Sequence, residues 1–501
     1  MSLKKVLDPV FATKDIDTRH IGVLDGIRAL SIIFVCGFHF WQQSWLWNLS
    51  SDKPFSWIPG FFKSLGVENV SLNWLYSCGY VFVDMMILLT GLCLFLPYAN
   101  AMLDKTKLPG VGRFYLKRVA RIFPSYYFCI AVLAIFFVSV SSYGGNVDAY
   151  NKDLLTHLSF THMFFKETYL STKFNGVLWT LCVEMMFYII FPLLAYLFTK
   201  APLLTYLGMN GVSLAYYILV IRKHVNDMSF YVNRFPTFLC VFANGMMAAL
   251  LITALAKRMK QNKYTGLLFT LVAIFSLYIL RIVLKYGLAT TANGQFWQVQ
   301  NRFLVSIIFT SFIIGATFSF NWFRAIFSNP VARFLSTISF NLYIWHQFLS
   351  VKLKEWHIPM YVSESGMPQT DAGREWQWKY TAVCWIASIL VATVVTFVVE
   401  KPLHKLITKG IKIKKKPAAP ETVTETPMLE VSTPMPEVST PMPAEEAPVP
   451  GIPEEPPVTE AAEELPAPEN TEENNENVED IFLIKKQEND YEKRHGIDAR
   501  Q

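Results

Sequence analysis

Three polar side chains interrupt the first long apolar stretch of the chain: Asp25, Arg28 and His39. In an α-helix, a separation of eleven residues places Arg28 and His39 within about 20° of one face and about 16 Å apart along the axis. Asp25 lies one turn before Arg28 on the same face. Charged side chains inside a bilayer cost on the order of 2.5–3.5 kcal/mol each on insertion scales, so they are candidate functional residues. A neutral imidazole there can take a proton from a hydroxyl group or attack a thioester.

Structural explanations exist for the same residues. Arg28 can extend to the membrane interface or pair with Asp25, and His39 can pack between helices. The helical spacing by itself does not choose between these explanations and chemistry.

A cluster of basic residues follows the second apolar stretch. Arg113, Lys117, Arg118 and Arg121 have the spacing i, i+4, i+5 and i+8, which gathers them along one side of a helix start. The helix dipole is also positive there, and phosphate groups suit such a place. Basic residues at this position are equally typical of the cytoplasmic loops of membrane proteins and of contacts with lipid headgroups.

Glu184 lies about a third of the way into the fourth apolar stretch, at a depth comparable to that of His39. A carboxylate there could orient the imidazole and stabilise its protonated form. Alternatively, a protonated carboxyl could form a hydrogen bond between helices. Further polar groups in apolar stretches are better explained by helix packing; they are Asp84, Thr90, Gly91, Asn341 and His346.

The elements that must position these side chains are membrane-spanning helices. The chain has 501 residues, of which 52% are hydrophobic and 17% charged, and its mean hydropathy is +0.30. Soluble globular chains are not composed in this way. A span needs roughly 20 apolar residues, and we predict an all-α integral membrane protein with about ten transmembrane helices. The predicted spans are about 21–47, 74–99, 122–142, 177–198, 203–221, 235–256, 264–285, 302–320, 331–351 and 378–399.

The basic residues in the short links predict the orientation of the spans. They concentrate after the second, sixth, eighth and tenth spans, which lie on one side if both termini are cytoplasmic. We therefore expect a multi-pass protein of the cell membrane, with longer outside links at about 48–73, 143–176 and 352–377 as platforms for an external acceptor. Some basic residues oppose this rule and leave the orientation of the spans within 203–285 open; they are Arg222, Lys223, Arg234 and Lys285.

The formal net charge of +6 is a cancellation between two unlike parts. Residues 417–501 hold 21 of the 39 acidic residues, 5 of the 45 basic ones and 14 of the 27 prolines. Such a composition predicts a disordered cytoplasmic tail, which either recruits a cytoplasmic partner or has no specific role. The predicted organisation is a cytoplasmic N-terminal segment (1–20), a transmembrane domain (21–405), a basic juxtamembrane segment (406–416) and the acidic tail (417–501).

Two kinds of site are not expected. The basic residues lie in short loops separated by apolar runs, so no continuous patch for nucleic acid is predicted. The seven cysteines are scattered singly without a CxxC motif, which indicates buried thiols with no disulfide framework and no metal site.

Six short motifs follow one another along roughly residues 20–405. They are Leu24-Asp25-Gly26-Ile27-Arg28-Ala29-Leu30 with Phe38-His39, Val83-Asp84 with Thr90-Gly91, Phe114 to Pro124, Leu178 to Tyr188, Ile338 to His346, and Val399-Glu400-Lys401-Pro402. Together they resemble the membrane-bound acyltransferase family 3. The resemblance implies a ten-helix domain that takes an acyl group, usually acetyl, from cytoplasmic acyl-CoA and delivers it to a hydroxyl of an extracytoplasmic, cell-envelope or exported carbohydrate.

The resemblance also implies roles for individual residues. His39 would act on the acceptor hydroxyl or carry the acyl group itself, with Arg28 as the arginine of the family's Arg-x10-His pair and Glu184 as its acidic residue. The basic set would hold the phosphates of the acyl-CoA co-substrate; it consists of Arg118 and Arg121, which match the family's Arg-x-x-Arg element, together with Lys117 and Arg113. No metal is required. No SGNH-type hydrolase domain is fused to the C-terminus, so the acyl group would pass directly to the acceptor or to a separate extracytoplasmic partner.

This sequence departs from the family pattern at a few positions. Thr90 stands where the family usually has Ser, and Met185 replaces a second acidic residue. These changes bear on substrate details more than on activity.

A transporter or flippase for a glycan or lipid precursor is the alternative function, because intramembrane charges can also line a transport pathway. Against it, the two halves of the chain show no internal repeat and no pair of helices broken by Gly or Pro.

Overall fold

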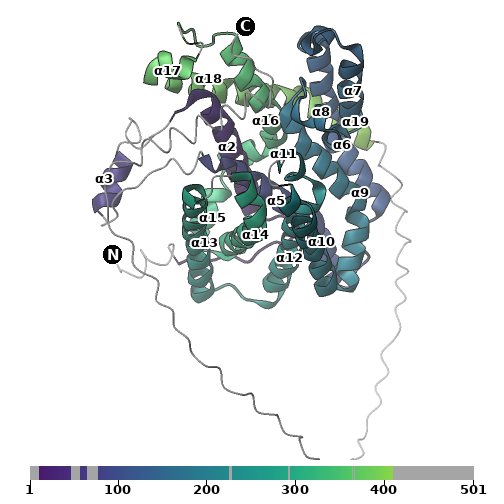
Figure 1. Cartoon of the computed structure of the whole chain (residues 1–501). Coiled ribbons are helices and arrows are strands. Elements are labelled where there is room, and N and C mark those ends of the chain that lie inside the picture. Colours follow the sequence, from purple (N-terminus) through teal and green to yellow (C-terminus); the bar gives the residue numbers. More distant parts are fainter. Residues whose placement is uncertain are drawn as a thin grey trace, which may run out of the picture. The chain divides into compact units, whose positions relative to one another are not determined.

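The computed structural model describes residues 11–46, 57–64, 77–224, 228–290, 294–363, 365 and 367–409. All regular secondary structure in these residues is helical (Figure 1). Ten of the described helices have 18 or more residues, and each corresponds to one predicted span. They are α2 (Val23–Ser44), α5 (Phe82–Leu103), α6 (Val111–Phe136), α9 (Trp179–Lys200), α10 (Pro202–Leu219), α12 (Phe235–Arg258), α13 (Lys263–Thr290), α14 (Gly294–Phe318), α16 (Pro330–Glu355) and α18 (Gly373–Val394). The predicted all-α fold is confirmed, while the predicted tail lies outside the described residues.

Nine stretches of the described chain are long and apolar enough to cross a membrane, which makes this a multi-pass membrane protein. The remaining long helix, α16, is less apolar because it carries polar residues along its length. Several of these face other helices, since Asn341 and His346 are both fully buried and α16 packs against α2 and α18. These two polar groups of α16 therefore lie within the bundle, away from lipid.

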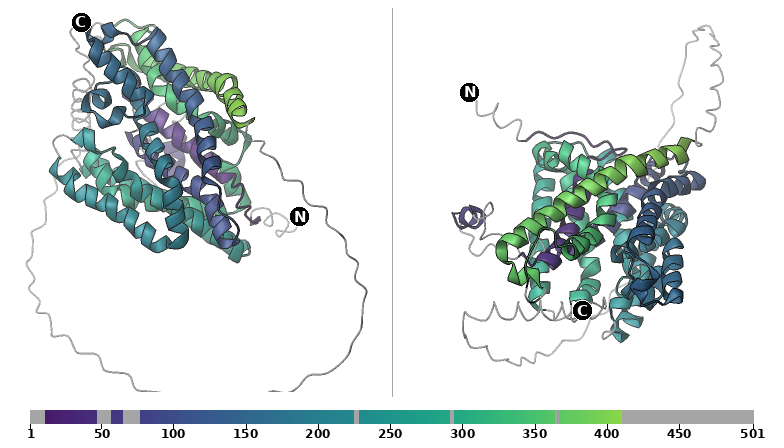
Figure 2. Two further views of the ribbon diagram at one scale, coloured as in Figure 1. Left: turned by 90° about the vertical axis from the view of Figure 1, so that its right-hand side faces the viewer. Right: turned by 90° about the horizontal axis from the view of Figure 1, so that it is seen from above.

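The helix α2 runs through the interior of the bundle (Figure 2). It packs against α16, α5, α18 and α14, and its buried residues include Ile27, Val35 and Phe40. Two other helices, α5 and α12, approach each other closely through small residues. A Cβ atom on Gly245 would lie 2.2 Å from the carbonyl oxygen of Leu88, so a larger residue cannot be placed there without moving the backbone.

The helix that contains the predicted third span begins eleven residues before the predicted start of that span. The prediction was 122–142, whereas α6 runs from Val111 to Phe136. Its first three turns are amphipathic, with Phe114 and Ala120 buried and Arg113 exposed. A hydropathy window detects only the uniformly apolar part of such a helix, so the predicted span begins after the basic cluster, although the spacing of that cluster correctly predicts a helix start.

The last predicted span, 378–399, also continues beyond its predicted end. The helix α18 passes into a π-helical segment, η8 (Val395–Glu400), and then into α19 (Lys401–Lys409), forming one long rod (Figure 2). The predicted boundary at residue 405 therefore falls within a helix.

The described part of the predicted outside link 143–176 is folded. It contains α7 (Val147–Leu158), a short turn at His162–Phe164 and α8 (Lys166–Leu170). Arg234, one of the residues that oppose the charge rule, donates hydrogen bonds to the carbonyl oxygens of Met163 and Phe230 and lies 3.7 Å from the ring centroid of Phe230. The Arg234 side chain therefore joins the segment before α12, to which it belongs, to the segment before α9, which contains Met163.

Candidate active site

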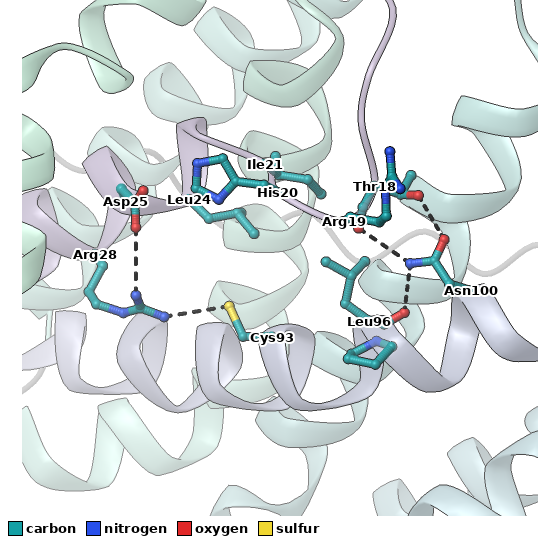
Figure 3. Close-up of a pocket in the computed structure, with 11 residues that line it drawn as sticks. Thr18, Arg19, His20, Ile21, Leu24, Asp25, Arg28, Cys93, Leu96 and Asn100 are labelled. Carbon is teal, nitrogen blue, oxygen red and sulfur yellow. Dashed lines mark hydrogen bonds and ion pairs between the residues drawn. The ribbon is translucent and has the colours of Figure 1, made fainter. Parts of the chain in front are cut away.

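A cavity of about 370 Å³ opens beside the beginning of α2 (Figure 3). Its walls come from the segment before α2, from α2 and from the second half of α5; the lining residues are Thr18, Arg19, His20, Ile21, Leu24, Asp25, Arg28, Cys93, Leu96, Pro97 and Asn100. The Thr18 hydroxyl donates a hydrogen bond to Asn100 Oδ1 at 2.7 Å, and the Asn100 amide donates to the Thr18 carbonyl oxygen at 3.3 Å. These two bonds fix the leading segment against α5 and so shape the cavity.

Arg28 lies in the wall of this cavity (Figure 3). Its Nη2 is 3.5 Å from Cys93 Sγ, and its Nη1 is 3.9 Å from Asp25 Oδ1. Asp25 also accepts a hydrogen bond from Ser336 of α16 at 3.1 Å. The ion pair of Arg28 with Asp25 is thus present but long, and the side chains are 32% and 26% exposed, respectively.

Glu184 belongs to this charged region rather than to His39. It accepts a hydrogen bond from Tyr188, one turn further along α9, and the guanidinium groups of Arg118, Arg121 and Arg28 act electrostatically on its carboxylate. In the described structure it forms no hydrogen bond with the imidazole of His39. The expectation that Glu184 orients His39 is therefore not what the geometry shows, because equal depth in two helices does not make their side chains point toward each other.

The predicted basic cluster is divided between the interior and the surface. Arg121 donates a hydrogen bond to Glu400 Oε1 at 2.7 Å, and the guanidinium of Arg118 lies 5.6 Å from the ring centroid of Tyr188. Arg113 and Lys117 are exposed. The four residues therefore lie at the edge of the helix bundle. Arg118 and Arg121 have partners inside the protein, whereas Arg113 and Lys117 face outward.

Glu400 is a buried charged residue to which sequence reasoning assigned no role. It is 3% exposed and accepts hydrogen bonds from Arg121 and from the Asn341 amide, the latter at 2.7 Å. It stands at the end of the π-helical segment η8, and single π-helical turns are frequent at functional positions. Glu400 enters the sequence analysis only as part of the last family motif, because the predicted last span ends at residue 399 and the partners of Glu400 lie far away in the sequence.

His39 lies near the other end of α2. Its Nδ1 is 3.0 Å from Gln42 Oε1, and its ring centroid is 5.1 Å from that of His346 on α16. The side chain is only partly buried. Gln42, one turn along the same helix, is the group that hydrogen-bonds to the imidazole. The i+3 spacing of Gln42 could have indicated this bond, whereas the approach of His346 depends on how α16 packs against α2.

A second pair of histidines lies in the link between α6 and α9. The rings of His157 and His162 stack with centroids 3.9 Å apart, His157 Nδ1 is 3.0 Å from Asp153 Oδ1, and Cys182 Sγ is 3.3 Å from His162 Nδ1. Burial holds the pKa of His162 well below its usual value, and the neighbouring His157 lowers this pKa further. His162 is therefore neutral near pH 7, and the cluster joins the link to the start of α9.

Asp84 pairs with an arginine that sequence reasoning missed. Arg302 Nε is 3.2 Å from Asp84 Oδ2, and both side chains are 1% exposed. Arg302 also donates to Thr237 Oγ1 at 2.6 Å and lies 4.0 Å from the ring centroid of Phe238. Arg302 is the first residue of the predicted span 302–320, where a basic residue looks like the edge of a span. The ion pair joins α5, α12 and α14 in the interior.

Fold and site together define a class: a multi-pass helical membrane protein with a lined cavity at one end of an interior helix and an imidazole centre near the other. A family model described as "Acyltransferase domain" matches residues 21–400. The chain therefore belongs to this acyltransferase family, as the order of its motifs predicted.

Individual proteins show the same similarity at low identity. A "Putative acetyltransferase" of Acidianus two-tailed virus is 26% identical over 241 residues, which cover 47% of this chain and 64% of that protein. A "Putative O-acetyltransferase" of Staphylococcus aureus strain COL is 24% identical over 368 residues, which cover 70% of this chain and 54% of that protein. The chain thus spans between half and two-thirds of the length of these relatives. No solved structure matches it.

Proposed function

We propose that the protein is a membrane O-acyltransferase that moves an acyl group, in the first place acetyl, from cytoplasmic acyl-CoA to a hydroxyl of a cell-envelope or exported carbohydrate. Membership of the acyltransferase family and the O-acetyltransferase names of its relatives support the reaction class. The observation that carries the proposal is the placement of a cavity with Arg28 and an accessible imidazole, His39, on one helix that spans the bundle. In this proposal both termini are cytoplasmic and the end of α2 faces outward.

The cavity beside α2 suits the arm of the donor. A volume of about 370 Å³ falls within the range of small-molecule sites, and apolar side chains such as Leu24 and Leu96 line it together with Arg28. In the proposed reaction, a pantetheine arm enters here from the cytoplasm. The Arg28 guanidinium then contacts the arm on the path along which the thioester reaches His39.

His39 acts at the acceptor end in this proposal. Its Nδ1 is engaged by Gln42, which leaves Nε2 for chemistry. Two routes fit the geometry: His39 deprotonates the acceptor hydroxyl as it attacks the thioester, or His39 is first acylated and then transfers the group. Either route needs a long, flexible donor arm, because Arg28 and His39 are about 16 Å apart along α2.

The phosphates of acyl-CoA would meet the outward-facing part of the basic cluster first. Arg113 and Lys117 are exposed at the start of α6 and have no described acidic partner. Arg121, by contrast, is bound to Glu400, and Arg118 lies against Tyr188 near Glu184. These two inner arginines can bind phosphate only if they exchange their present contacts.

Charge reversal of the outward pair, in Arg113→Glu with Lys117→Glu, should raise the KM for acyl-CoA by about tenfold and leave kcat nearly unchanged. Hydrogen bonds to charged groups contribute about 1.5–3 kcal/mol each, so losing two attractive contacts has at least this effect. Initial rates at varied acyl-CoA concentration in inside-out vesicles would measure it. The matched control is Lys405→Glu with Lys409→Glu on α19, which changes exposed charges on a neighbouring helix. An equal rise of the KM in the control would indicate general surface electrostatics instead of a phosphate site.

Cys93 offers a direct test of the donor cavity. Six of the seven cysteines are buried, whereas Cys93 is partly exposed and lines the cavity. We expect a small maleimide to modify Cys93 first, and saturating acetyl-CoA to slow this modification severalfold, as measured by mass spectrometry of the intact, detergent-solubilised protein. Adenosine 3′,5′-bisphosphate lacks the pantetheine arm and should protect weakly. Protection that is equal with both compounds, or absent with both, would show that the arm does not occupy this cavity.

The reaction itself is tested with radiolabelled acetyl-CoA and oriented membrane vesicles. We expect base-labile ester on envelope glycan only when the donor is on the cytoplasmic face. If no ester forms with folded protein and with several acyl-CoA chain lengths, the transporter or flippase becomes the better assignment. The acceptor would be identified from the labelled product, including any separate extracytoplasmic protein that receives the acyl group.

A further inference from the structure

The helix α5 carries a line of residues that are not fully buried, although the helix lies inside the bundle and packs against α2, α9, α12 and α14. Most residues on its other faces are buried. This α5 line begins at the donor cavity and continues away from it; its members are Asn100, Pro97, Cys93, Thr90, Met86 and Val83. At 100° per residue, Thr90 and Met86 lie within about 60° and about 20° of the direction of Cys93. The α5 line therefore extends the cavity wall along one face of the helix.

Five helices surround the side of α5 on which this line lies. α5 packs against α2 and α9, α9 packs against α6, α6 against α16, and α16 against α2, which closes a ring. Polar groups point into this ring from several helices. The guanidinium of Arg28 on α2 acts on the carboxylate of Glu184 on α9, and so do two arginines of α6, Arg118 and Arg121. Cys93 of α5 faces the same region, because its Sγ is 3.5 Å from Arg28 Nη2 (Figure 3). The α5 line thus faces the interior of the ring and not lipid.

Partial exposure inside a ring of packed helices requires room that a water molecule can reach. Residues of α5 that face a neighbouring helix directly, such as Leu88 and Leu92, are 0% exposed, as expected of a close-packed interior. Thr90 and Met86, by contrast, are both partly exposed. The packing between α5 and the rest of the ring is therefore incomplete at these two side chains.

The α5 line covers the same stretch of the bundle as α2 does from Arg28 to His39. The two helices run antiparallel: Cys93 lies beside Arg28, and the ring centroid of Tyr80, just before α5, is 5.3 Å from that of Phe38. The residues of α2 that lie between Arg28 and His39 on the same face are 0% exposed; they are Ile32 and Val35. A donor arm that extends from Arg28 to His39 therefore has room beside α5, whereas this face of α2 is closed.

Thr90 brings a hydrogen-bond acceptor to this stretch. Its Oγ1 donates a hydrogen bond to the carbonyl oxygen of Met86 at 3.0 Å, so the hydroxyl proton is engaged and the lone pairs remain to accept. A pantetheine arm carries two amide N–H groups, which need acceptors when they leave water. Met86, one turn further from the cavity, offers an unbranched thioether side chain that adapts to the shape of its neighbour. The sequence explains Thr90 by helix packing, but its bond is to its own helix.

We infer that Thr90 and Met86 bind the pantetheine arm between the cavity and His39. Thr90 accepts a hydrogen bond from an amide of the arm, and Met86 packs against its methylene groups. The inference rests on the proposed acyl transfer, because it supplies the path between the two centres that this reaction needs. Both residues bind the donor and take no part in bond making or breaking.

The accessibility of introduced thiols tests the inference without measuring activity. In the full-length protein with Cys93→Ser, reconstituted in vesicles, we expect Thr90→Cys and Met86→Cys to react with a small, charged methanethiosulfonate, because this reagent needs water. Saturating acetyl-CoA should slow both reactions severalfold, and adenosine 3′,5′-bisphosphate, which lacks the arm, should not. The matched control is Leu92→Cys, at a buried position of the same helix, which should stay unmodified.

Equal reaction rates at the three positions, including no reaction at any of them, would overturn the inference. Reaction of Thr90→Cys and Met86→Cys at a rate that acetyl-CoA leaves unchanged would overturn it as well, because the arm would then not occupy the space beside α5.

The hydrogen bond is tested separately by steady-state kinetics. Thr90→Val keeps the shape of the side chain and removes the acceptor. We expect the KM for acetyl-CoA to rise about fivefold, the effect of a typical hydrogen bond, while kcat stays nearly unchanged. Thr90→Ser should keep the KM of the wild type. The matched control is Thr253→Val on α12, where a fully buried hydroxyl donates in the same way to the carbonyl oxygen of Ala249 of its own helix at 2.8 Å.

An equal rise of the KM in Thr253→Val, or a rise in Thr90→Ser as large as in Thr90→Val, would overturn the role of the Thr90 hydroxyl. Failure of the proposed function has a different signature. Wild-type protein would then transfer no acyl group from acetyl-CoA or longer acyl-CoAs, and the thiol experiment would still decide whether the arm lies beside α5.

Discussion

Replacing His39 by alanine should reduce acyl transfer by at least about 100-fold while the protein remains folded. Among the described residues at this end of α2, His39 is partly exposed and its neutral imidazole can accept a proton from a hydroxyl group; general acid–base catalysis contributes about 10²–10⁴ to a rate. The side chain projects beside Gln42 and His346 without carrying any charge-charge pair, so its loss leaves no uncompensated ion. Transfer of radiolabel from acetyl-CoA into glycan ester is the appropriate measurement.

Two variants on the same turn of α2 separate chemistry from packing. Gln42→Ala removes the bond to Nδ1 and should give an intermediate loss, because the imidazole then samples both tautomers. Gln43→Ala changes the adjacent amide, whose side chain makes no described contact with His39, and should leave the rate within about twofold of wild type. A rate for His39→Ala that equals that of Gln43→Ala would contradict the assignment of His39 to the reaction.

The largest effect on stability should come from breaking the ion pair between Asp84 and Arg302. Both side chains are 1% exposed, so Asp84→Ala leaves a guanidinium without a counter-charge in the interior. Removing one partner of a buried pair typically destabilises a protein by about 3–5 kcal/mol. We expect a marked drop in the temperature at which the detergent-solubilised protein loses its monodisperse peak in size-exclusion chromatography.

The double variant Asp84→Ala with Arg302→Met is the informative companion. Replacing both charges with apolar groups removes the desolvation penalty together with the attraction, so it should recover most of the lost stability. Lys352→Ala provides the surface control, because its ion pair with Glu355 at 2.6 Å is partly exposed and should contribute less than about 1 kcal/mol. A double variant as unstable as Asp84→Ala would show that the hydrogen bonds of Arg302, such as the one to Thr237, matter more than its charge.

The sequence predicted the spans and the polar face of α2 because both depend on local periodicity. A run of about 20 apolar residues identifies a membrane helix, and the 100° turn per residue places Arg28 and His39 on one face without knowledge of any other helix. The boundaries were less accurate. The amphipathic start of α6 and the last turn containing Glu400 fall outside apolar windows, and this is where Arg121 meets Glu400.

The partners of these residues could not be predicted in the same way. Arg302 lies 218 positions from Asp84, and Glu400 lies 279 positions from Arg121. Periodicity gives the direction of a side chain on its own helix, but it does not say which helix packs against that direction. The prediction that Glu184 orients His39 relied on depth alone. In the structure, Glu184 interacts with Tyr188 and with the arginines, whereas His39 forms its hydrogen bond with Gln42.

Because α2 is one unbroken helix from Arg28 to His39, the number of residues between them sets the distance between the donor cavity and the imidazole. Each inserted residue would lengthen the distance from Arg28 to His39 by about 1.5 Å and rotate His39 by about 100°. A single insertion would therefore turn the imidazole away from α16 before the change in length mattered. Only insertions of nearly whole turns keep His39 pointing toward α16. The distance that a donor arm must span from Arg28 to His39 can therefore change only in steps of about 5.4 Å. In proteins built on this helix, donors of different length would be accommodated by the cavity rather than by moving His39.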